Sequence, residues 1–354
     1  MNNKIKVLIV DDSAFMRKSL TLMLESDDSI EIIDTARDGL DALEKVQKYR
    51  PDVVTLDIEM PKMDGLTVLK KIMSDFPTPV LMVSSLTEEG AESTIKALEL
   101  GAVDFIPKGK SFVNIDFVKL KEEIIYKVKS IAHKKKIQET YNRINKLSIA
   151  KPSQKLTYDE AKIGNNFKAV CIGISTGGPF TLQKLLPQIS PKLLSPIFIV
   201  QHMPPKFTAS LANRLNSLCQ LEVKEGENLE IVKKGTIYIA PGGKQMMVAK
   251  NSKDEIVINI SDYPNDTLHK PSVDVLFESA ADIYKSYLLS VVMTGMGRDG
   301  TKGVEKIKKY GGKCIAQDEE SCVVYGMPKS VVEAGLADAV APLEKIPNLI
   351  NMGA

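Results

Sequence analysis

Apolar and polar positions follow a repeating order over residues 1–126. Five short runs rich in β-branched residues are almost continuously apolar, which is typical of strands covered on both faces of a sheet. These runs are 5–10, 31–36, 52–58, 78–84 and 103–107. Between them lie segments whose apolar positions recur at helical spacing, namely 17–26, 41–49, 65–75 and 93–101. The five-fold alternation predicts a (βα)5 domain with an open parallel sheet and right-handed crossovers.

The pattern fades after Tyr126 and returns near residue 167. The intervening residues are typical of a frayed helix that runs into a basic, polar linker. Beyond it strands are expected at 168–174, 196–200, 236–240, 288–293 and 313–317, and helices at 181–189, 207–218, 272–284 and 301–311. Two further strands, 245–250 and 255–260, predict a β-hairpin insertion. We therefore expect an α/β protein of two doubly wound parallel-sheet domains, 1–126 and a Rossmann-like 167–354, with a linker over 127–166.

The composition is that of an ordinary soluble globular protein, with 44% hydrophobic and 26% charged residues among 354. No apolar stretch approaches the roughly 18 residues that a membrane span needs. The first apolar run is short and ends in Asp11 and Asp12, so we expect no secretory signal. The four cysteines form no CxxC pair, which disfavours a zinc knuckle or a redox dithiol. Reduced thiols and a cytoplasmic location are expected.

The formal net charge of +2 is the sum of three unlike segments. Residues 1–126 carry 16 basic against 23 acidic residues, a net charge of −7. Residues 127–146 carry 7 against 1, a net charge of +6, and residues 147–354 carry 24 against 21, a net charge of +3. The basic segment falls in the linker, which favours a solvated hinge over a nucleic-acid-binding arm.

Polar side chains lie at the ends of four strands of the first domain. Asp11 and Asp12 follow the first strand, Asp57 ends the third, and Ser84 and Lys108 end the fourth and fifth. Ligands of open α/β sheets gather at the carboxyl ends of the strands. Converging carboxylates repel one another unless a cation lies between them, and hard oxygen ligands suit Mg²⁺. The alternative is that the acidic residues only cap helices, since Asp12 and the adjacent Ser13 are both good N-cap residues.

These residues lie in the motifs VDDS, TLDIEMPKMDG, VSS and FIPK, and the first region resembles a response-regulator receiver domain. The resemblance implies that Asp57 is the phosphoacceptor, that Ser84 and Phe105 are a switch pair, and that Lys108 contacts the phosphoryl group. The Mg²⁺ ligands that it implies are Asp11, Asp12 and Asp57. One departure is Gly109, where many receivers have proline.

The second domain begins with a strand that ends in the turn GISTGGP, which contains Ser175. A serine on a Gly-x-Ser-x-Gly turn between a strand and a helix is held out of the sheet beside backbone N–H groups. Those groups can bind a developing oxyanion. The alternative is a glycine turn in which the serine caps the helix. The turn matches neither G-x-G-x-x-G nor a loop ending in Gly-Lys-Ser/Thr, which disfavours nucleotide binding.

The chain has three histidines, and they differ in their positions. His133 lies in the basic linker and is expected to be solvated. His202 directly follows a strand, so we expect it at the same sheet edge as Ser175, where it can act as a general base. His269 precedes a helix that Ser272 is expected to cap, and it is the second candidate for the base or a substrate contact. Asp299 lies in the segment 294–300 that follows the expected strand 288–293, and it can orient the imidazole. The alternative is that this Asp-Gly pair only forms a turn.

The segments GISTGGP, QHMPP, APGG, HKPSVDVLF, GMGRDG and AQDEESCVVYGMP make residues 167–347 resemble the catalytic domain of chemotaxis protein-glutamate methylesterases. The resemblance implies that Ser175 is the nucleophile, His202 the base and Asp299 its orienting partner. It also implies that the backbone at Thr176 and Met296 stabilises the oxyanion, and that the esterase reaction needs no cofactor.

The resemblance implies hydrolysis of glutamate γ-methyl esters, and deamidation of glutamines, on the cytoplasmic helices of chemoreceptors. A chemotaxis histidine kinase would supply the phosphoryl group, and we expect a monomer without nucleic-acid binding or membrane insertion. Our regulatory hypothesis is that the unphosphorylated receiver covers the Ser175 edge and that phosphorylation of Asp57 opens it. The competing classes are a receiver with a DNA-binding output, supported by the basic stretch 127–146 alone, and a non-catalytic scaffold.

Overall fold

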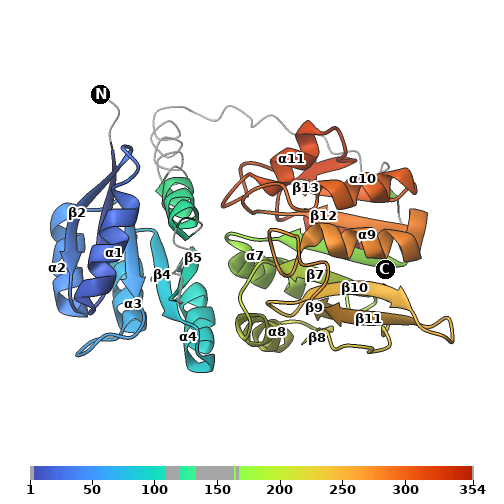
Figure 1. Cartoon of the computed structure of the whole chain (residues 1–354), viewed down its shortest axis with the longest axis horizontal. Helices are drawn as coiled ribbons and strands as arrows, with labels where there is room; N and C mark the ends of the chain where they lie inside the picture. The colour runs from blue at the N-terminus through green and yellow to red at the C-terminus, as the bar shows by residue number, and fades with distance from the viewer. Residues whose placement is uncertain (1–3, 109–117, 119, 133–162, 165–166, 353–354) are drawn as a thin grey trace. The chain divides into compact units, whose positions relative to one another are not determined.

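The computed structural model describes residues 4–108, 118, 120–132, 163–164 and 167–352. The chain divides into two compact units, Met1–Ser153 and Gln154–Ala354 (Figure 1). No helix in the described part of the chain is long and apolar enough to cross a bilayer. Each unit is an α/β structure, which confirms the expected fold class.

The first unit contains a five-stranded parallel sheet in the order β2-β1-β3-β4-β5. Its strands are β1 (Ile5–Val10), β2 (Ile30–Ala36), β3 (Val53–Asp57), β4 (Val80–Ser85) and β5 (Asp104–Lys108). Its helices are α1 (Ala14–Leu24), α2 (Gly39–Tyr49), α3 (Gly65–Asp75), α4 (Glu88–Glu99) and residues 120–132. The strand order reverses between β1 and β3, and such a switch point is where open α/β sheets place their ligands.

One face of this sheet is covered by α1 and the helix 120–132. Leu20 and Leu24 of α1 share a buried core with Ile124, Val128 and Ile131 of that helix. Residues 127–132, which the sequence pattern assigns to the linker, therefore continue a helix that packs on the first domain. The remaining linker residues, 133–162 and with them His133, lie outside the described residues, and the division at 126 and 166 stays a prediction.

The second unit contains a seven-stranded sheet in which all strands are parallel, in the order β14-β13-β12-β6-β7-β9-β8. The strands are β6 (Ala169–Ile174), β7 (Ile197–Gln201), β8 (Glu222–Glu225), β9 (Thr236–Ile239), β12 (Leu288–Val292), β13 (Lys313–Gln317) and β14 (Ala339–Ala341). The helices are α7 (Gly178–Leu185), α8 (Phe207–Leu218), α9 (Val273–Tyr284), α10 (Thr301–Lys309), α11 (Met327–Glu333) and α12 (Ile346–Asn351). The edge strands β8 and β14 and the helices α11 and α12 are additions to the elements expected from the sequence.

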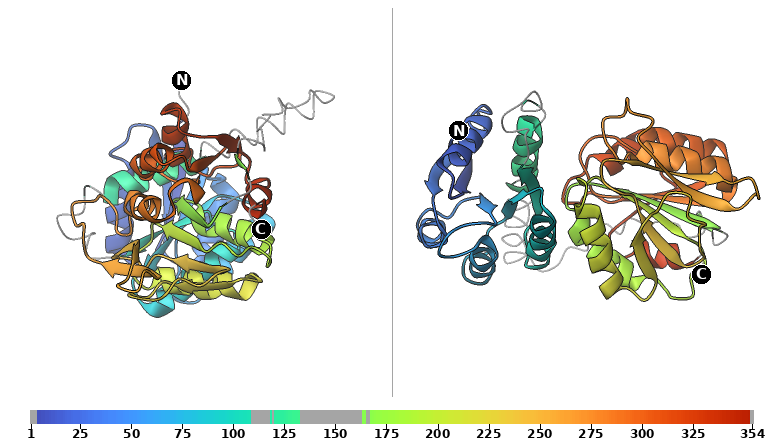
Figure 2. Two further views of the ribbon diagram at one scale, coloured as in Figure 1. Left: turned by 90° about the vertical axis from the view of Figure 1, so that its right-hand side faces the viewer. Right: turned by 60° about the horizontal axis from the view of Figure 1, so that its bottom comes forward.

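The antiparallel hairpin β10 (Gln245–Lys250) and β11 (Ile256–Ser261) forms a separate small sheet, as expected. It lies against α9 (Figures 1 and 2). Val248 and Ile258 of the hairpin, Phe277 of α9 and Tyr238 of β9 belong to one buried core. This packing fixes the start of α9, and that start borders the candidate active site.

Candidate functional sites

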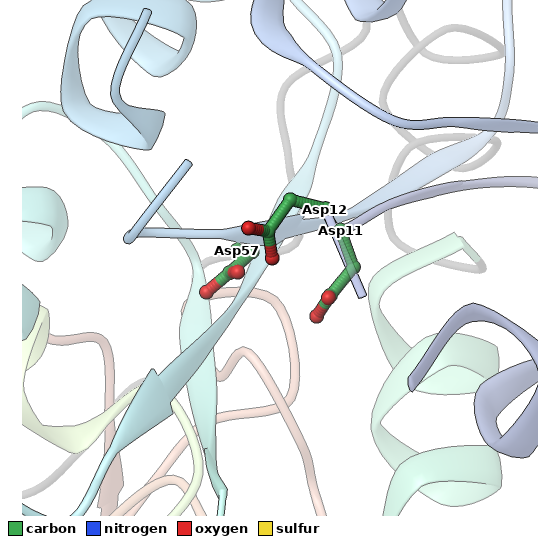
Figure 3. Close-up of side chains that lie close together, drawn as sticks. All are labelled: Asp11, Asp12 and Asp57. Carbon is green, nitrogen blue, oxygen red and sulfur yellow. The ribbon is translucent and has the colours of Figure 1, made fainter. Parts of the chain in front are cut away.

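The carboxyl edge of the first sheet carries three carboxylates that lie close together (Figure 3). Asp11 and Asp12 follow β1, and Asp57 is the last residue of β3. One ligand oxygen from each lies within 4.8 Å of the others. Asp11 and Asp57 are buried, whereas Asp12 is exposed. Three carboxylate oxygens at this spacing form a donor set that suits a hard divalent cation such as Mg²⁺.

Lys108 is the cation that the structure places at this cluster. Its Nζ lies 3.0 Å from Oδ2 of Asp11 and 2.7 Å from Oδ2 of Asp57. Burial raises the pKa of Asp57 to about 6, and the neighbouring charge of Asp11 adds to this while Lys108 opposes it. The two ion pairs outweigh the burial of Lys108 and raise its pKa, so its ammonium stays charged. Helix capping does not explain the cluster, because Ser13 is the N-cap residue of α1.

The two residues of the expected switch pair lie on neighbouring strands. The hydroxyl of buried Ser84 in β4 donates to the carbonyl of Gly90 at 3.1 Å. Phe105 in β5 is 4% exposed, and its carbonyl accepts from Nζ of Lys127 at 2.8 Å. Lys127 also forms an ion pair with Asp104 at 3.1 Å and lies buried in the helix 120–132. Sequence reasoning missed Lys127, because nothing in a basic stretch marks one lysine as buried.

In the second unit, Ser175 directly follows β6 on the turn that leads into α7. Its N–H donates to the carbonyl of Thr294 at 2.9 Å. Its carbonyl accepts from the N–H of Gly178 at 2.8 Å and from Nε2 of Gln201 at 3.0 Å. A Cβ on Gly295 would lie 2.7 Å from Cβ of Ser175, so only glycine permits this approach. The backbone of Ser175 is thereby held between the carboxyl ends of β7 and β12.

Thr294 links three segments around the nucleophile. Its buried hydroxyl donates to the carbonyl of Thr176 at 2.9 Å. The same oxygen accepts from the N–H groups of Val323 at 3.1 Å and Val324 at 3.0 Å. Its own N–H donates to Oε1 of Gln317, the last residue of β13, at 2.9 Å. The loop that contains Met296 is therefore tied both to the Ser175 turn and to the segment that follows β13.

His202 follows β7 and bonds Asp299. Its Nε2 lies 2.8 Å from Oδ2 of Asp299, and both side chains are largely buried. The N–H of His202 donates to the carbonyl of Ile174 at 3.1 Å, and Ile174 immediately precedes Ser175. The structure thus brings the three residues expected for a Ser-His-Asp site to one edge of the sheet.

Only one ring nitrogen of His202 is left to accept a proton from a nucleophile. Because Nε2 is bonded to the carboxylate, the lone pair lies on Nδ1, which is buried and has no hydrogen-bond partner among the described residues. This is the reverse of the assignment in chymotrypsin-like proteases, where Nδ1 bonds the aspartate. The ring of His269 stacks on that of His202 with centroids 4.1 Å apart. His269 therefore packs on the expected base, while Asp299 bonds His202.

Asp299 also lies at the beginning of α9. Its carboxylate accepts from the N–H groups of Val273 at 2.8 Å and Asp274 at 3.0 Å, and from the hydroxyl of Ser272 at 3.0 Å. Burial raises its pKa, but the hydrogen bond from His202 and these N–H groups outweigh that and hold the pKa below its usual range. Ser272 is the N-cap residue of α9, as expected, but its side chain does not bond the helix, because its hydroxyl donates to Asp299 instead.

A cavity of about 690 Å³ opens beside His269 and Asp299. Leu268, Arg298 and Lys302 are among the residues that line it. Leu268 is 79% exposed, so an apolar side chain projects at the margin of the site. The cavity is large enough to receive side chains of a protein substrate beside Asp299, the residue that bonds His202.

The comparisons with known proteins bear on both units. A model of the CheB methylesterase family matches residues 170–350. A protein-glutamate methylesterase/protein-glutamine glutaminase from Pyrococcus horikoshii is 47% identical over 350 residues, which cover 99% of this chain and 94% of that protein. The chain belongs to the CheB methylesterase family. A response regulator receiver domain model matches residues 7–116, which confirms the resemblance of the first region.

Further members of the CheB family show the same agreement. The protein-glutamate methylesterase/protein-glutamine glutaminase of Thermotoga maritima is 46% identical and covers 97% of this chain and 96% of its own length. The crystal structure of the CheB methylesterase catalytic domain from Thermotoga maritima is 48% identical to this chain, with a TM-score of 0.51. It covers 52% of this chain and 98% of that domain. These matches favour a hydrolase over the DNA-binding alternative.

Proposed function

We propose that this chain is a phosphorylation-regulated protein-glutamate methylesterase of chemotaxis that also deamidates glutamines. The observation that carries the proposal is the 2.8 Å contact between Nε2 of His202 and Asp299, at the sheet edge where Ser175 lies. The proposed substrates are methyl-esterified glutamates and glutamines on the cytoplasmic helices of chemoreceptors, and the activities are those that the relatives' names state. The proposed place of action is the cytoplasm.

In the proposed reaction the hydroxyl of Ser175 attacks the side-chain carbonyl and transfers its proton to Nδ1 of His202. Asp299 accepts from Nε2–H, which keeps Nδ1 available and stabilises the imidazolium that forms. His202 then protonates the leaving group, methanol from the ester or ammonia from the amide. A water molecule attacks the acyl-enzyme with His202 again as base, which releases glutamate and restores the serine.

The tetrahedral intermediate carries a negative oxygen that needs hydrogen-bond donors. We assign this role to the backbone N–H groups of Thr176 and Met296. Thr294 supports the assignment, because its side chain bonds the carbonyl of Thr176 and it lies two residues before Met296. Loss of one oxyanion donor slows such enzymes by roughly a hundredfold to a thousandfold.

In the receiver domain, Asp57 would attack the phosphoryl group of a phosphodonor, proposed to be a chemotaxis histidine kinase, to form an acyl phosphate. Lys108 and Ser84 would contact the transferred oxygens. The three carboxylates fit Mg²⁺ in number, spacing and chemistry. When bound by Asp11, Asp12 and Asp57, the ion neutralises phosphoryl charge. We propose that the unphosphorylated receiver covers the sheet edge at Ser175. Phosphorylation of Asp57 would then shift the population towards a state in which this edge is uncovered, with Ser84 and Phe105 transmitting the change.

The test is methanol release from methylated chemoreceptor by the full chain, with and without acetyl phosphate as a small-molecule phosphodonor. We expect acetyl phosphate to increase turnover, Asp57→Asn to abolish the increase, and Ser175→Ala to abolish turnover itself. Ser217→Ala, at an exposed serine of α8, is the matched control and should behave like the wild type. Full activity of Ser175→Ala would overturn the nucleophile, and turnover insensitive to acetyl phosphate would overturn the regulation.

A further inference from the structure

Two carboxylates at the active-site edge cap each other's helices. Asp299, just before α10, accepts from the first N–H groups of α9. Asp274, in the first turn of α9, accepts from the N–H of Gly300 at 2.9 Å and of Gly303 at 2.8 Å, at the start of α10. The exchange ties the segment that contains Asp299 to α9 at both of its ends.

The N-terminus of α10 depends on this arrangement. Gly300 occupies the N-cap position and offers no side-chain acceptor. Of the four N–H groups that a helix leaves unpaired at its start, Asp274 satisfies one at the cap and one within the first turn. A Cβ at Gly303 would clash with Phe277, so the two helices pack closely at this point. No other side chain in the described part of the chain bonds these two N–H groups.

The surroundings of Asp274 disfavour the charged form of its carboxyl group. Burial raises its pKa to about 6, and the neighbouring charge of Asp299 adds to the increase, whereas the N–H groups of Gly300 and Gly303 lower it. Capping alone needs no carboxylate, because serine or asparagine caps a helix equally well. What the pairing adds is a second anchor for the segment on which Asp299 lies.

The position of Asp299 determines which ring nitrogen of His202 can accept a proton. Its Oδ2 must stay within hydrogen-bond distance of Nε2 of His202, because otherwise Nδ1 is not fixed as the proton acceptor. Gly300, which directly follows Asp299, is held by Asp274. We propose that Asp274 is a positioning residue of the hydrolase, which acts on catalysis through Asp299 by holding this segment against α9.

The inference rests on the proposed methylesterase function, and the test separates the two. The kcat and KM for methanol release are measured for the full-length wild type, Asp274→Ala, Asp274→Asn, Asp299→Asn and the double variant Asp274→Ala/Asp299→Asn. The matched control is Asp338→Ala, because Asp338 also accepts a backbone N–H and bonds Lys308 at the other end of α10. Melting temperatures show whether each variant is folded.

We expect Asp274→Ala to lower kcat by roughly tenfold to a hundredfold with little change in KM. Asp274→Asn, which keeps an acceptor for the N–H groups, should restore most of the activity. Asp338→Ala should lower the melting temperature without lowering kcat. Residues that act as one unit are not additive, so Asp274→Ala should add little to Asp299→Asn. An unchanged kcat in Asp274→Ala, a full multiplicative effect in the double variant, or no rescue by asparagine would overturn the proposal.

A second readout does not use the substrate. We expect the imidazole proton between His202 and Asp299 to give a low-field proton resonance in NMR spectra, which the loss of the signal in Asp299→Asn identifies. We expect the resonance to weaken or disappear in Asp274→Ala and to persist in Asp274→Asn and Asp338→Ala. A wild type that shows the resonance but releases no methanol contradicts the proposed function alone. A resonance unaltered in Asp274→Ala contradicts the positioning role alone.

Discussion

Thr294→Val removes one buried oxygen and keeps the shape of the side chain. The threonine hydroxyl bonds the carbonyl of Thr176 and the N–H groups of Val323 and Val324. Valine leaves all three without that partner. The Thr176 carbonyl and the Val324 N–H are buried, and each unsatisfied buried group costs about 1–3 kcal/mol. The part-buried Val323 N–H can reach water, so the two buried groups predict a loss of about 2–6 kcal/mol in the stability of the second unit.

The same substitution is expected to slow catalysis. Thr294 holds the backbone at Thr176 and fixes the start of the loop that contains Met296, the two residues to which we assign the oxyanion. A small displacement of donors in an active site costs roughly tenfold or more in rate. We therefore expect kcat for methanol release to fall by about tenfold or more.

Hydrogen exchange in a urea series, followed by mass spectrometry, assigns the lost stability to each unit by peptide. Ser290→Ala is the matched control, since Ser290 lies on β12, the strand just before Thr294, and its hydroxyl donates to the carbonyl of Lys313 at 3.0 Å. It should cost about 1 kcal/mol and leave kcat unchanged. If Thr294→Val matches Ser290→Ala in both stability and kcat, Thr294 is an ordinary core residue and the reasoning fails.

Three further outcomes are expected. Gly178→Ala places a Cβ against the side chain of Gln201, which must then give up its hydrogen bond to the carbonyl of Ser175. The rate of methanol release should therefore fall sharply, while the midpoint of urea unfolding changes little. The hydrogen bond from Lys129 lowers the pKa of Asp27 to about 2. Asp27→Asn should therefore lower the free energy of unfolding by at most about 1 kcal/mol at neutral pH. This stabilisation is complete above pH 4 and disappears as the pH falls towards 2, which acid titrations of wild type and variant will show. Lys127→Met leaves the buried carboxylate of Asp104 without its ion-pair partner. It should destabilise the first unit by about 3–5 kcal/mol, measured by urea titration. An unchanged urea midpoint would refute this.

Much of the fold could be predicted because its signals are local. The five strands of the first sheet each bury a short apolar run, and every such run was visible in the sequence. The edge strands β8 and β14 were not, because three of the four residues of β8 are charged and β14 has only three residues. At the margin of a sheet a strand needs little apolar surface, so periodicity has little to detect.

The site was predictable to the same extent. Ser175 and His202 could be named because each directly follows a strand, and Asp299 because it lies in the loop after β12. Parallel strands deliver such residues to one edge of the sheet. Thr294 and Asp274 could not, because their importance lies in hydrogen bonds to segments distant along the chain. The side-chain bond expected of the N-cap residue Ser272 is absent for the same reason, since the hydroxyl donates to a tertiary acceptor, Asp299.

The strand order of the second unit has a consequence for biosynthesis. β6, the first strand of its sheet, lies between β7 and β12, so the Ser175 turn must wait for Thr294 and Gly295, more than a hundred residues later. Domains fold as units during translation, the N-terminal one first. The receiver can therefore finish folding while the hydrolase domain is still an incomplete nascent chain. The esterase site forms only after the domain that regulates it has folded.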